Sequence, residues 1–478
     1  MIIDWRPDKD SNVPLFRQIV KHFEESIRSS KYKIDTRFPS QRALSELFGV
    51  NRSTIALAMD ELKALGLIET RGKGGTRVSS IPDDVGSFDW NDYVEDSMYY
   101  PNREIIQKIN DLDFDDQIIR LSSGAAMPES FKITKLHDLI EEAARITEAL
   151  DYTEPKGLYS LRKELCANLK TIGIDTDPSE ILIVSGALQA IQLIALGLLQ
   201  RGSTALIEKP SYLYSLNILK SLDMRKRGID CDEAGIIPDA LYKARPKNHH
   251  SVLYTIPNYQ NPTGRLMSEE RRKETLAVCE ELNIPILEDD VYRELWIDAP
   301  PPAPLKSMET KGQVLYIGSV SKHLSPGLRI GWVVGPTSVI DRLSDIKMQV
   351  DYGASTLSQI VTELWFKSSH RQIALDEIRS RLKKRRDAAI RALEAHMAGF
   401  GTWKVPMGGF YVWVDLNKNI SEDQLFQKAV EAGVLIYPGH VYGTDSGSAI
   451  RISYSSESEE RIEEGIRKLS NVVRVFEE

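Results

Sequence analysis

Hydrophobic residues recur at helical spacing near the start of the chain. After Pro14, the segment LFRQIVKHFEESIRSS places Leu15, Ile19, Phe23 and Ile27 four residues apart, which forms one face of an amphipathic helix. Proline is also a favoured residue at the start of a helix. This pattern predicts a first helix that begins directly after Pro14.

A shorter second helix is predicted in the segment FPSQRALSELFGV. Ser40 is a suitable N-cap, and Gly49 would end the helix. The apolar residues Ala43, Leu44 and Leu47 would face inward.

A third helix is predicted after a tight turn, with Asn51 as its N-cap and its end at Gly66. Its buried stripe would consist of Ile55, Met59, Leu62 and Leu65. Two short helices joined by a tight glycine-containing turn are typical of a helix-turn-helix.

The next segment, LIETRGKGGTRVSS, predicts a small hairpin. Leu67 to Glu69 and Thr76 to Val78 are strand-like, and residues 71–75 between them form a glycine-rich basic tip. Such a hairpin after a helix-turn-helix is a two-stranded wing.

From about residue 118 the pattern changes to short apolar strands that alternate with helical stretches. The segments ILIVSG, TALIEKP, SVLYTIP, PILEDD and QVLYIGSV predict strands, and QAIQLIALGLLQ predicts a helix. This alternation is typical of a mostly parallel sheet wrapped by helices, the α/β class. Ligands of such sheets bind at the carboxyl ends of the strands.

The composition is that of a soluble protein with more than one domain. The 478 residues, 42% of them hydrophobic, exceed what one core usually organises. No apolar stretch reaches membrane-spanning length, and the start MIIDWRPDKD lacks the features of a signal peptide. The cysteines Cys166, Cys231 and Cys279 are isolated, which argues against disulfides and a zinc site. These features predict a cytoplasmic protein without a bound metal.

The net charge of -8 is unevenly distributed and suggests where the domains divide. Residues 11–80 carry 12 Lys/Arg and 7 Asp/Glu, whereas residues 81–117 carry 2 Lys/Arg and 11 Asp/Glu. We therefore predict a basic domain over 11–80, an acidic linker over 81–117 and a nearly neutral, enzyme-like domain over 118–478. The basic charge alone is also compatible with a solvated surface. The linker contains Trp90, Tyr93, Tyr99 and Tyr100, which we expect to be partly docked on a domain.

At residues 11–80 the chain resembles the GntR family of winged-helix transcription regulators, whose P-S-x-R-x-L and V-x-R-x-T pattern and glycine-rich wing it matches almost throughout. The resemblance implies that the third helix enters the major groove of DNA, where Arg52 and Ser53 can reach bases or phosphates. The implied DNA contacts are Arg42, Arg52, Ser53, Thr54, Arg71, Lys73 and Gly74. Ala56 stands where many members carry an arginine, so one base contact is absent. The alternative is a winged helix that binds only protein.

The segment GSVSKHLSPGLRIG places a lysine at the end of an apolar strand, with hydroxyl groups just before it and an arginine seven residues later. An amine beside an anion site can trap the carbonyl of a phosphorylated compound. The segment resembles the pyridoxal-phosphate motif of fold-type I aminotransferases. By this resemblance Lys322 forms a Schiff base with the cofactor, and Ser319, Ser321 and Arg329 hold its phosphate.

Other segments match that family in the expected order. The backbone of Gly186, Ala187 and Leu188 opens a helix and can bind phosphate, although Ala187 lacks the hydroxyl that many members have there. The resemblance implies that Tyr212 stacks on the cofactor ring and that Asn261 hydrogen-bonds its phenolic oxygen.

The remaining matches concern the cofactor nitrogen and the substrate. Asp289, rather than Asp290, has the spacing to Tyr292 expected of the carboxylate at the pyridine nitrogen. The resemblance makes Lys322, Asp289 and Tyr292 the catalytic set. It also implies that Arg451 grips a substrate or effector carboxylate.

A further match concerns assembly. Tyr152 is similar to the tyrosine that reaches the phosphate of the partner subunit in a homodimer.

A winged helix joined to a fold-type I aminotransferase-like domain, which ends in a smaller α+β subdomain, resembles the MocR subfamily. The resemblance implies a regulator that binds promoter DNA and senses an amino acid or amine as an external aldimine of pyridoxal phosphate. Two alternatives stay open, a working aminotransferase with an appended DNA-binding domain and a sensor of the cofactor itself. Our hypothesis is that effector binding moves elements near Arg451 and that the acidic linker carries the change to the winged helix.

Overall fold

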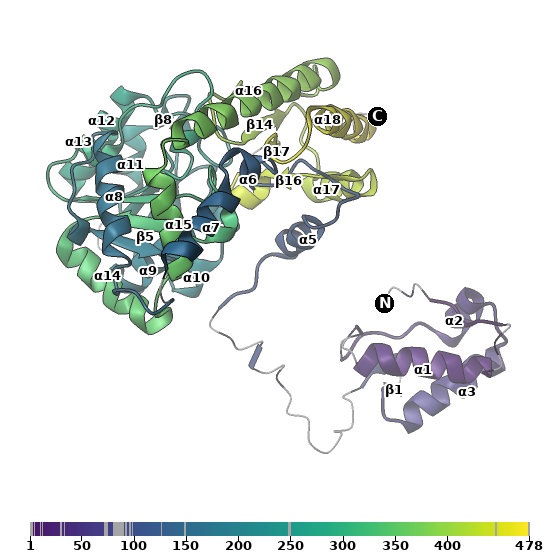
Figure 1. The fold of residues 1–478 in the computed structure, drawn as a ribbon. Coiled ribbons are helices and arrows are strands. Elements are labelled where there is room, and N and C mark those ends of the chain that lie inside the picture. The colour runs from purple at the N-terminus through teal and green to yellow at the C-terminus, as the bar shows by residue number, and fades with distance from the viewer. Residues whose placement is uncertain are drawn as a thin grey trace. The chain divides into compact units, whose positions relative to one another are not determined.

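The structure is a computed structural model that divides into two compact units, Met1–Ser97 and Met98–Glu478 (Figure 1). It describes residues 3, 5–9, 11, 13–28, 31–32, 34–70, 75–79, 90, 93–94, 97, 99–125, 127–147, 150–246, 250–444 and 447–476.

The first unit is a winged helix, as its hydrophobic pattern predicts. Its elements are α1 (Leu15–Arg28), α2 (Gln41–Phe48), α3 (Arg52–Ala64), β1 (Ile68–Thr70) and β2 (Thr76–Val78). The strands β1 and β2 pair antiparallel. Ile19, Phe23 and Ile27 of α1 are buried against Ile55 and Met59 of α3, so the core consists of the stripes that the sequence indicates.

Three of the predicted inward positions in this unit are wrong. In α2 the buried residues are Leu44 and Phe48, four apart, whereas Ala43 is exposed and Leu47 is 37% exposed. The buried face of α2 is therefore rotated about the helix axis relative to the predicted face. Leu65 is 38% exposed because α3 ends at Ala64 and Leu65 is its C-cap.

The second unit contains the predicted mostly parallel sheet. Five strands fall within the predicted segments: β4 (Ile181–Val184), β5 (Thr204–Glu208), β9 (Ser251–Thr255), β10 (Ile286–Asp289) and β11 (Val314–Ser319). With β6 (Arg225–Ile229) and β12 (Gly331–Val334) they form a seven-stranded sheet in the order β4-β12-β11-β10-β9-β5-β6. Only β12 is antiparallel to its neighbours in this sheet.

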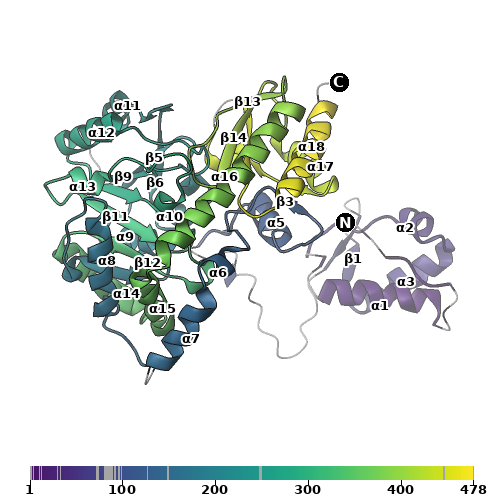
Figure 2. The ribbon, with the colours of Figure 1, turned by 45° about the horizontal axis from the view of Figure 1, so that its top comes forward.

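Alternate residues of these strands face two helical layers, which Figure 2 shows on opposite sides of the sheet. Leu206, Leu253 and Ile286 belong to a core with α11 (Pro238–Ala244), α12 (Glu269–Leu282) and α13 (Leu305–Met308). The next residues along these strands belong to the larger core, which includes α9 (Ala187–Leu198) and α14 (Thr337–Val350). Burial on both faces explains why the strands are continuous hydrophobic runs.

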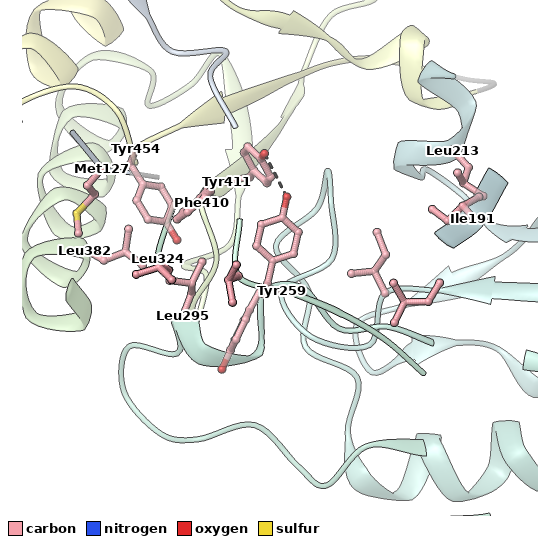
Figure 3. Close-up of a cluster of buried hydrophobic side chains, with 14 of the residues drawn as sticks. Met127, Ile191, Leu213, Tyr259, Leu295, Leu324, Leu382, Phe410, Tyr411 and Tyr454 are labelled. Atoms are coloured by element: carbon pink, nitrogen blue, oxygen red, sulfur yellow. Dashed lines mark hydrogen bonds between the residues drawn. The ribbon is translucent and has the colours of Figure 1, made fainter. Parts of the chain in front are cut away.

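The chain ends in the predicted smaller α+β subdomain. Its antiparallel sheet has the order β13 (Gly401–Trp403), β14 (Tyr411–Leu416), β17 (Ser448–Ser453) and β16 (Tyr437–Pro438). The helices of this part are α16 (Arg371–His396), α17 (Glu422–Glu431) and α18 (Glu459–Val475), and α16 runs beside α18 (Figure 1). The larger core extends into it, and Figure 3 shows Phe410 and Tyr454 near Leu295 and Leu324.

The second unit contains further helices and two short strand pairs. The helices are α6 (Ser130–Ile133), α7 (Leu136–Ile146), α8 (Tyr159–Lys170), α10 (Ile218–Ser221) and α15 (Thr356–Lys367). The strand pairs are β3 (Ile119–Arg120) with β15 (Val434–Leu435) and β7 (Cys231–Asp232) with β8 (Gly235–Ile236). None of the helices in the described ranges is both long and apolar enough to cross a membrane.

The end of the acidic segment belongs to the second unit. The helix α5 (Glu104–Leu112) buries Ile106 and Ile109, and just before it the backbone N–H of Tyr100 donates to Ser221 Oγ at 3.1 Å. The ammonium of Lys220 lies 3.9 Å from the centre of the Tyr100 ring. The expected docking of aromatic side chains holds only in part, because the rings of Trp90, Tyr93, Tyr99 and Tyr100 are 47 to 66% exposed.

Candidate functional site

A cavity of about 380 Å³ lies at the carboxyl ends of β10 and β11. Its wall combines these strand ends with the start of α9, the loop of residues 122–125, the C-terminal subdomain and α5. The predicted site residues in this wall are Ala187, Leu188, Tyr212, Asn261, Asp289, Tyr292, Ser319, Ser321, Lys322, Arg329 and Arg451. Segments far apart in the sequence thus meet where an α/β sheet usually binds its ligand.

Lys322 follows β11, and its side chain enters the cavity. The Nζ atom donates to the carbonyl oxygen of Gly124 at 2.7 Å and lies 5.7 Å from the centre of the Tyr292 ring. A Cβ at Gly124 would lie 2.5 Å from the Tyr411 hydroxyl and 3.8 Å from Nζ. The glycine therefore leaves the space that the Tyr411 hydroxyl occupies beside the lysine amine.

The two adjacent aspartates at the end of β10 have different environments. Asp289 lines the cavity and accepts a hydrogen bond from the Tyr254 hydroxyl at 2.7 Å. Asp290 instead accepts hydrogen bonds from Asn258, Arg293 and the Tyr316 hydroxyl. Of the two aspartates, Asp289 is therefore the one that faces the ligand cavity.

Burial controls the charge of this carboxyl. Desolvation raises the pKa of Asp289 to about 6, against the lowering effects of the hydrogen bond from Tyr254 and of the Lys322 charge. A carboxylate in this setting is stabilised by a ligand that brings a positive charge or a shared proton.

The opposite end of the cavity is suited to an anion. Gly186 is the N-cap of α9 with φ 92° and ψ 164°, and the helix N-terminus directs unpaired N–H groups outward. Arg329, in a left-handed conformation, donates from Nη2 to the carbonyl oxygen of Ser185 at 3.0 Å and so lies beside this terminus. Ser319 Oγ lies 2.9 Å from Ser321 Oγ. The three predicted phosphate-binding segments, which are the start of α9, the Ser319–Ser321 turn and Arg329, therefore line the same cavity.

Arg451 is buried in the cavity wall, yet it forms no ion pair among the described residues. Nη1 donates to Asn261 Oδ1 at 2.9 Å, and Nη2 donates to the carbonyl oxygen of Ser122. The guanidinium carbon lies 4.0 and 4.4 Å from the ring centres of Tyr411 and Tyr437. Its Nε atom has no hydrogen-bond partner.

The bond between Asn261 and Arg451 also determines the orientation of the asparagine. With its Oδ1 occupied by Arg451, Asn261 presents its amide nitrogen as the group available to a ligand. Tyr212 is connected to the same residue, because its backbone N–H donates to the carbonyl oxygen of Asn261 at 3.0 Å.

Several cavity residues were missed from the sequence. The Tyr411 hydroxyl lies 3.3 Å from the Tyr292 hydroxyl, the bond that a dashed line marks at Tyr411 in Figure 3. Burial, and next the negative charge of a titrating Tyr411, raises the pKa of Tyr292 well above its usual range. Tyr437 and, from α5, Asp113 also line the cavity. They were missed because both tyrosines lie in apolar segments that resemble core strands, and because Asp113 lies in an acidic segment of the sequence.

Tyr152 is not part of the cavity wall. Its side chain is 77% exposed, and its ring centre lies 4.9 Å from that of Tyr352. Its predicted role across a dimer is therefore not visible within one chain.

The predicted DNA-contacting residues fall into two groups. Arg52 and Ser53 are exposed in the first turn of α3, followed by the partly buried Thr54, and Arg42 of α2 is exposed and paired with Glu46 at 3.0 Å. Arg71, Lys73 and Gly74 lie outside the described residues.

The donor set does not suit a metal ion. Within the described ranges there is no group of three or more His, Cys, Asp or Glu side chains that could hold one. The cavity instead offers an amine, a buried carboxylate and an anion-binding terminus to one ligand.

Two protein-family models match the chain. The model of aminotransferase class I and II matches residues 116–469, and that of bacterial regulatory proteins of the gntR family matches residues 15–78. The HTH-type transcriptional regulator YdfD of Bacillus subtilis is 46% identical over 98% of both chains. The HTH-type transcriptional regulator NorG of Staphylococcus aureus is 32% identical, over 92% of this chain and 99% of its own.

Solved structures resemble the second unit. Kynurenine aminotransferase of Pyrococcus horikoshii, solved with PMP, has a TM-score of 0.76 and 30% identity and covers 84% of this chain and 100% of its own. LysN, the alpha-aminoadipate aminotransferase of Thermus thermophilus complexed with N-(5'-phosphopyridoxyl)-L-leucine, has a TM-score of 0.71 and 28% identity, with 78% and 95% covered.

Proposed function

The chain belongs to the aminotransferase class I and II family and carries a gntR-family domain, the combination of the MocR transcription regulators. From this premise we propose that it senses an amino acid or amine in its aminotransferase-like domain and that this ligand changes its binding to DNA. It is a DNA-binding transcription regulator with pyridoxal phosphate as its cofactor.

The cavity residues fit this cofactor. When bound, pyridoxal phosphate supplies an aldehyde that reacts with amines and a ring that withdraws electrons. Lys322 would hold the cofactor through its amine, and Asp289 would hold a proton at the pyridine nitrogen. The buried position of Asp289, free of the ion pair that occupies Asp290, supports this assignment.

The other cofactor contacts follow from the same wall. The start of α9 with Gly186, Ala187 and Leu188 would bind the phosphate together with Arg329, Ser319 and Ser321. Asn261 would donate from its amide nitrogen, Tyr212 would lie against the ring, and Tyr292 would contact the cofactor beside Lys322.

The observation that carries the effector proposal is Arg451. A buried guanidinium that pairs with no carboxylate in the described part of the chain, in the wall that also holds Lys322, is suited to bind a carboxylate that arrives with an amine. An amino acid offers both groups, and its amine would meet Lys322.

DNA binding is proposed to use the exposed first turn of α3. Arg52 and Ser53 would reach bases or phosphates, and Thr54 and Arg42 would support contacts to the backbone. Arg71, Lys73 and Gly74 of the wing tip would add phosphate contacts. In this proposal residues 11–80 bind DNA, and residues 118–478 bind the ligand together with α5, which precedes them in the same unit.

Assembly as a cytoplasmic homodimer is part of the proposal. An exposed Tyr152 next to Tyr352 is suited to reach a second copy, where it would contact the phosphate of the partner site. A twofold dimer would present two winged helices to two half-sites in the promoter.

The test follows the absorption of the cofactor-loaded protein during titration with a panel of amino acids and amines, together with binding to its own promoter region. We expect a persistent spectral change and an altered affinity for DNA with one ligand class. Lys322→Ala should abolish the spectral signal, and Arg451→Ala should abolish the response to amino acids. Arg391→Ala, an exposed arginine of α16, is the matched control. A DNA affinity that is equal with and without cofactor and ligands would refute sensing.

A second candidate, an active aminotransferase, is favoured by the shared wall of Lys322, Asp289, Tyr292 and Arg451. In that case the absorption would convert to that of the amine form of the cofactor, and an added keto acid would restore it. A response to pyridoxal phosphate that requires Lys322 but not Arg451 would instead indicate a sensor of the cofactor itself.

A further inference from the structure

The helix α5 brings a carboxylate into the wall of the cavity. Asp113 is the C-cap of α5 and lines the cavity with Ile109 and Asn110 of the same helix. Its side chain is half-buried, and burial raises the pKa of Asp113 above its usual range. A partly desolvated carboxylate in a ligand cavity requires a source of positive charge.

Arg451 supplies that charge through one shared residue. Ser122 Oγ donates to Asp113 Oδ1 at 3.3 Å, and the backbone carbonyl of Ser122 accepts from Arg451 Nη2. The charge of Arg451 lowers the pKa of Asp113 and opposes the effect of burial. The two groups therefore interact without a direct ion pair.

Arg120 of β3 is the second cation near Asp113. It lowers the pKa of Asp113 more than Arg451 does, and its Nη1 donates to the backbone carbonyl oxygen of Asp113 at 3.3 Å. Its Nε is paired with Glu457 at 3.4 Å, and Glu457 raises the pKa of Asp113. The Tyr437 ring of β16 lies against Arg451, at 4.4 Å. Of these two cations, Arg451 is the one that lines the cavity with Asp113.

We propose that Asp113 is the internal counter-charge of Arg451 and that a carboxylate ligand binds at Arg451 with uptake of one proton by Asp113. A second carboxylate at Arg451 raises the pKa of the partly desolvated Asp113 carboxyl, which favours its protonation. The ligand carboxylate stays ionised on Arg451, and the Asp113 carboxylate takes a proton from solvent. This inference rests on the proposed binding of the effector carboxylate at Arg451.

The proposal separates two ligand classes. A ligand with a carboxylate binds with proton uptake and binds more tightly as the pH falls, whereas an amine without a carboxylate leaves Asp113 unchanged. Asp113 thereby determines how much affinity a carboxylate ligand gains from Arg451. Asp113 lies at the C-terminal end of α5, the first helix of the second unit.

The test is calorimetric titration of the full-length, cofactor-loaded protein with propionate, a carboxylate that has no amine to titrate. Titrations at about pH 6 to 8 in buffers of different ionisation enthalpy count the protons taken up. We expect uptake by the wild type and none by Asp113→Asn, which keeps the acceptor for Ser122. The variant should bind propionate more tightly than the wild type, and the ratio of the two affinities should grow as the pH rises, up to about tenfold for each unit by which the ligand raises the pKa of Asp113. Asp111→Asn, an exposed neighbour on α5, is the matched control and should behave as the wild type.

The outcomes distinguish this proposal from the one on which it rests. If Arg451→Ala abolishes binding but wild type and Asp113→Asn bind equally with equal uptake, the counter-charge is refuted and the carboxylate site stands. If Arg451→Ala binds as well as the wild type, or if neither the wild type nor Asp113→Asn binds propionate, the placement of the carboxylate at Arg451 and the counter-charge are both refuted.

Discussion

Replacing Gly186 by alanine tests how the phosphate-binding end of the cavity is built. With φ 92° and ψ 164°, Gly186 has a conformation that is essentially restricted to glycine, so alanine costs about 1–3 kcal/mol of folding free energy. The new Cβ would lie 2.5 Å from Nη2 of Arg329. Because Arg329 is exposed and flexible at this end, its side chain should turn away and lose the bond to Ser185.

Gly399 is the matched control. It has φ 90°, and a Cβ there would meet no atom within 4 Å. Gly186→Ala and Gly399→Ala should therefore lose similar stability, about 1–3 kcal/mol, in urea unfolding of the cofactor-free protein.

The two variants should differ in cofactor affinity. Displacing Arg329 removes a charged hydrogen bond worth about 1.5–3 kcal/mol, so Gly186→Ala should bind pyridoxal phosphate about ten- to a hundredfold more weakly. Absorption titration of the cofactor-free protein measures this. Equal affinity of Gly186→Ala and Gly399→Ala would show that Arg329 does not depend on the glycine, and the reasoning would be wrong.

Three further predictions concern other parts of the chain. Since burial raises the pKa of Asp289 to about 6, the folded protein loses stability as the pH rises through that value. Cofactor-free Asp289→Asn should therefore unfold at a higher urea concentration than the wild type at about pH 7.5, and a difference that persists unchanged below about pH 4 would contradict this cause. Ser40→Ala removes the acceptor for the Ala43 N–H at 3.2 Å and should destabilise α2 by about 1 kcal/mol in hydrogen exchange. Asn51→Ala should cost less, because the Asn51 side chain makes no cap hydrogen bond, and equal losses would refute the capping argument. Arg52→Ala should weaken promoter binding, with the salt slope reduced by about one if Arg52 contacts phosphate, and unchanged affinity would exclude Arg52 from the interface.

The sequence predicts the helices and strands that have a regular hydrophobic pattern. It also predicts the site residues that lie at the ends of such strands. The strands around Asp289 and Lys322 are continuous apolar runs that end in polar residues, so both the sheet and the site could be located. The same holds for α1, whose buried residues keep a regular spacing.

Other features depend on tertiary contacts that no local pattern encodes. The short β12 reverses the parallel order of the sheet because the chain returns directly from β11 through residues 320–330. Tyr411 and Tyr437 lie in segments with the composition of core strands. Only their packing against Arg451 shows that they line a ligand cavity. Asp113 lies in an acidic run that favours a solvated linker, but the burial of Ile109 places it in the wall.

The position of α5 has a mechanical consequence. The chain enters the second unit through a helix whose residues Ile109, Asn110 and Asp113 form part of the ligand cavity. A force applied to the chain before α5 therefore acts on the wall of the cavity. A ligand that strengthens that wall raises the force at which α5 detaches, and by reciprocity tension on the chain lowers the affinity for that ligand by the same free energy. The bound small molecule thus determines the force that is needed to detach α5 from the second unit.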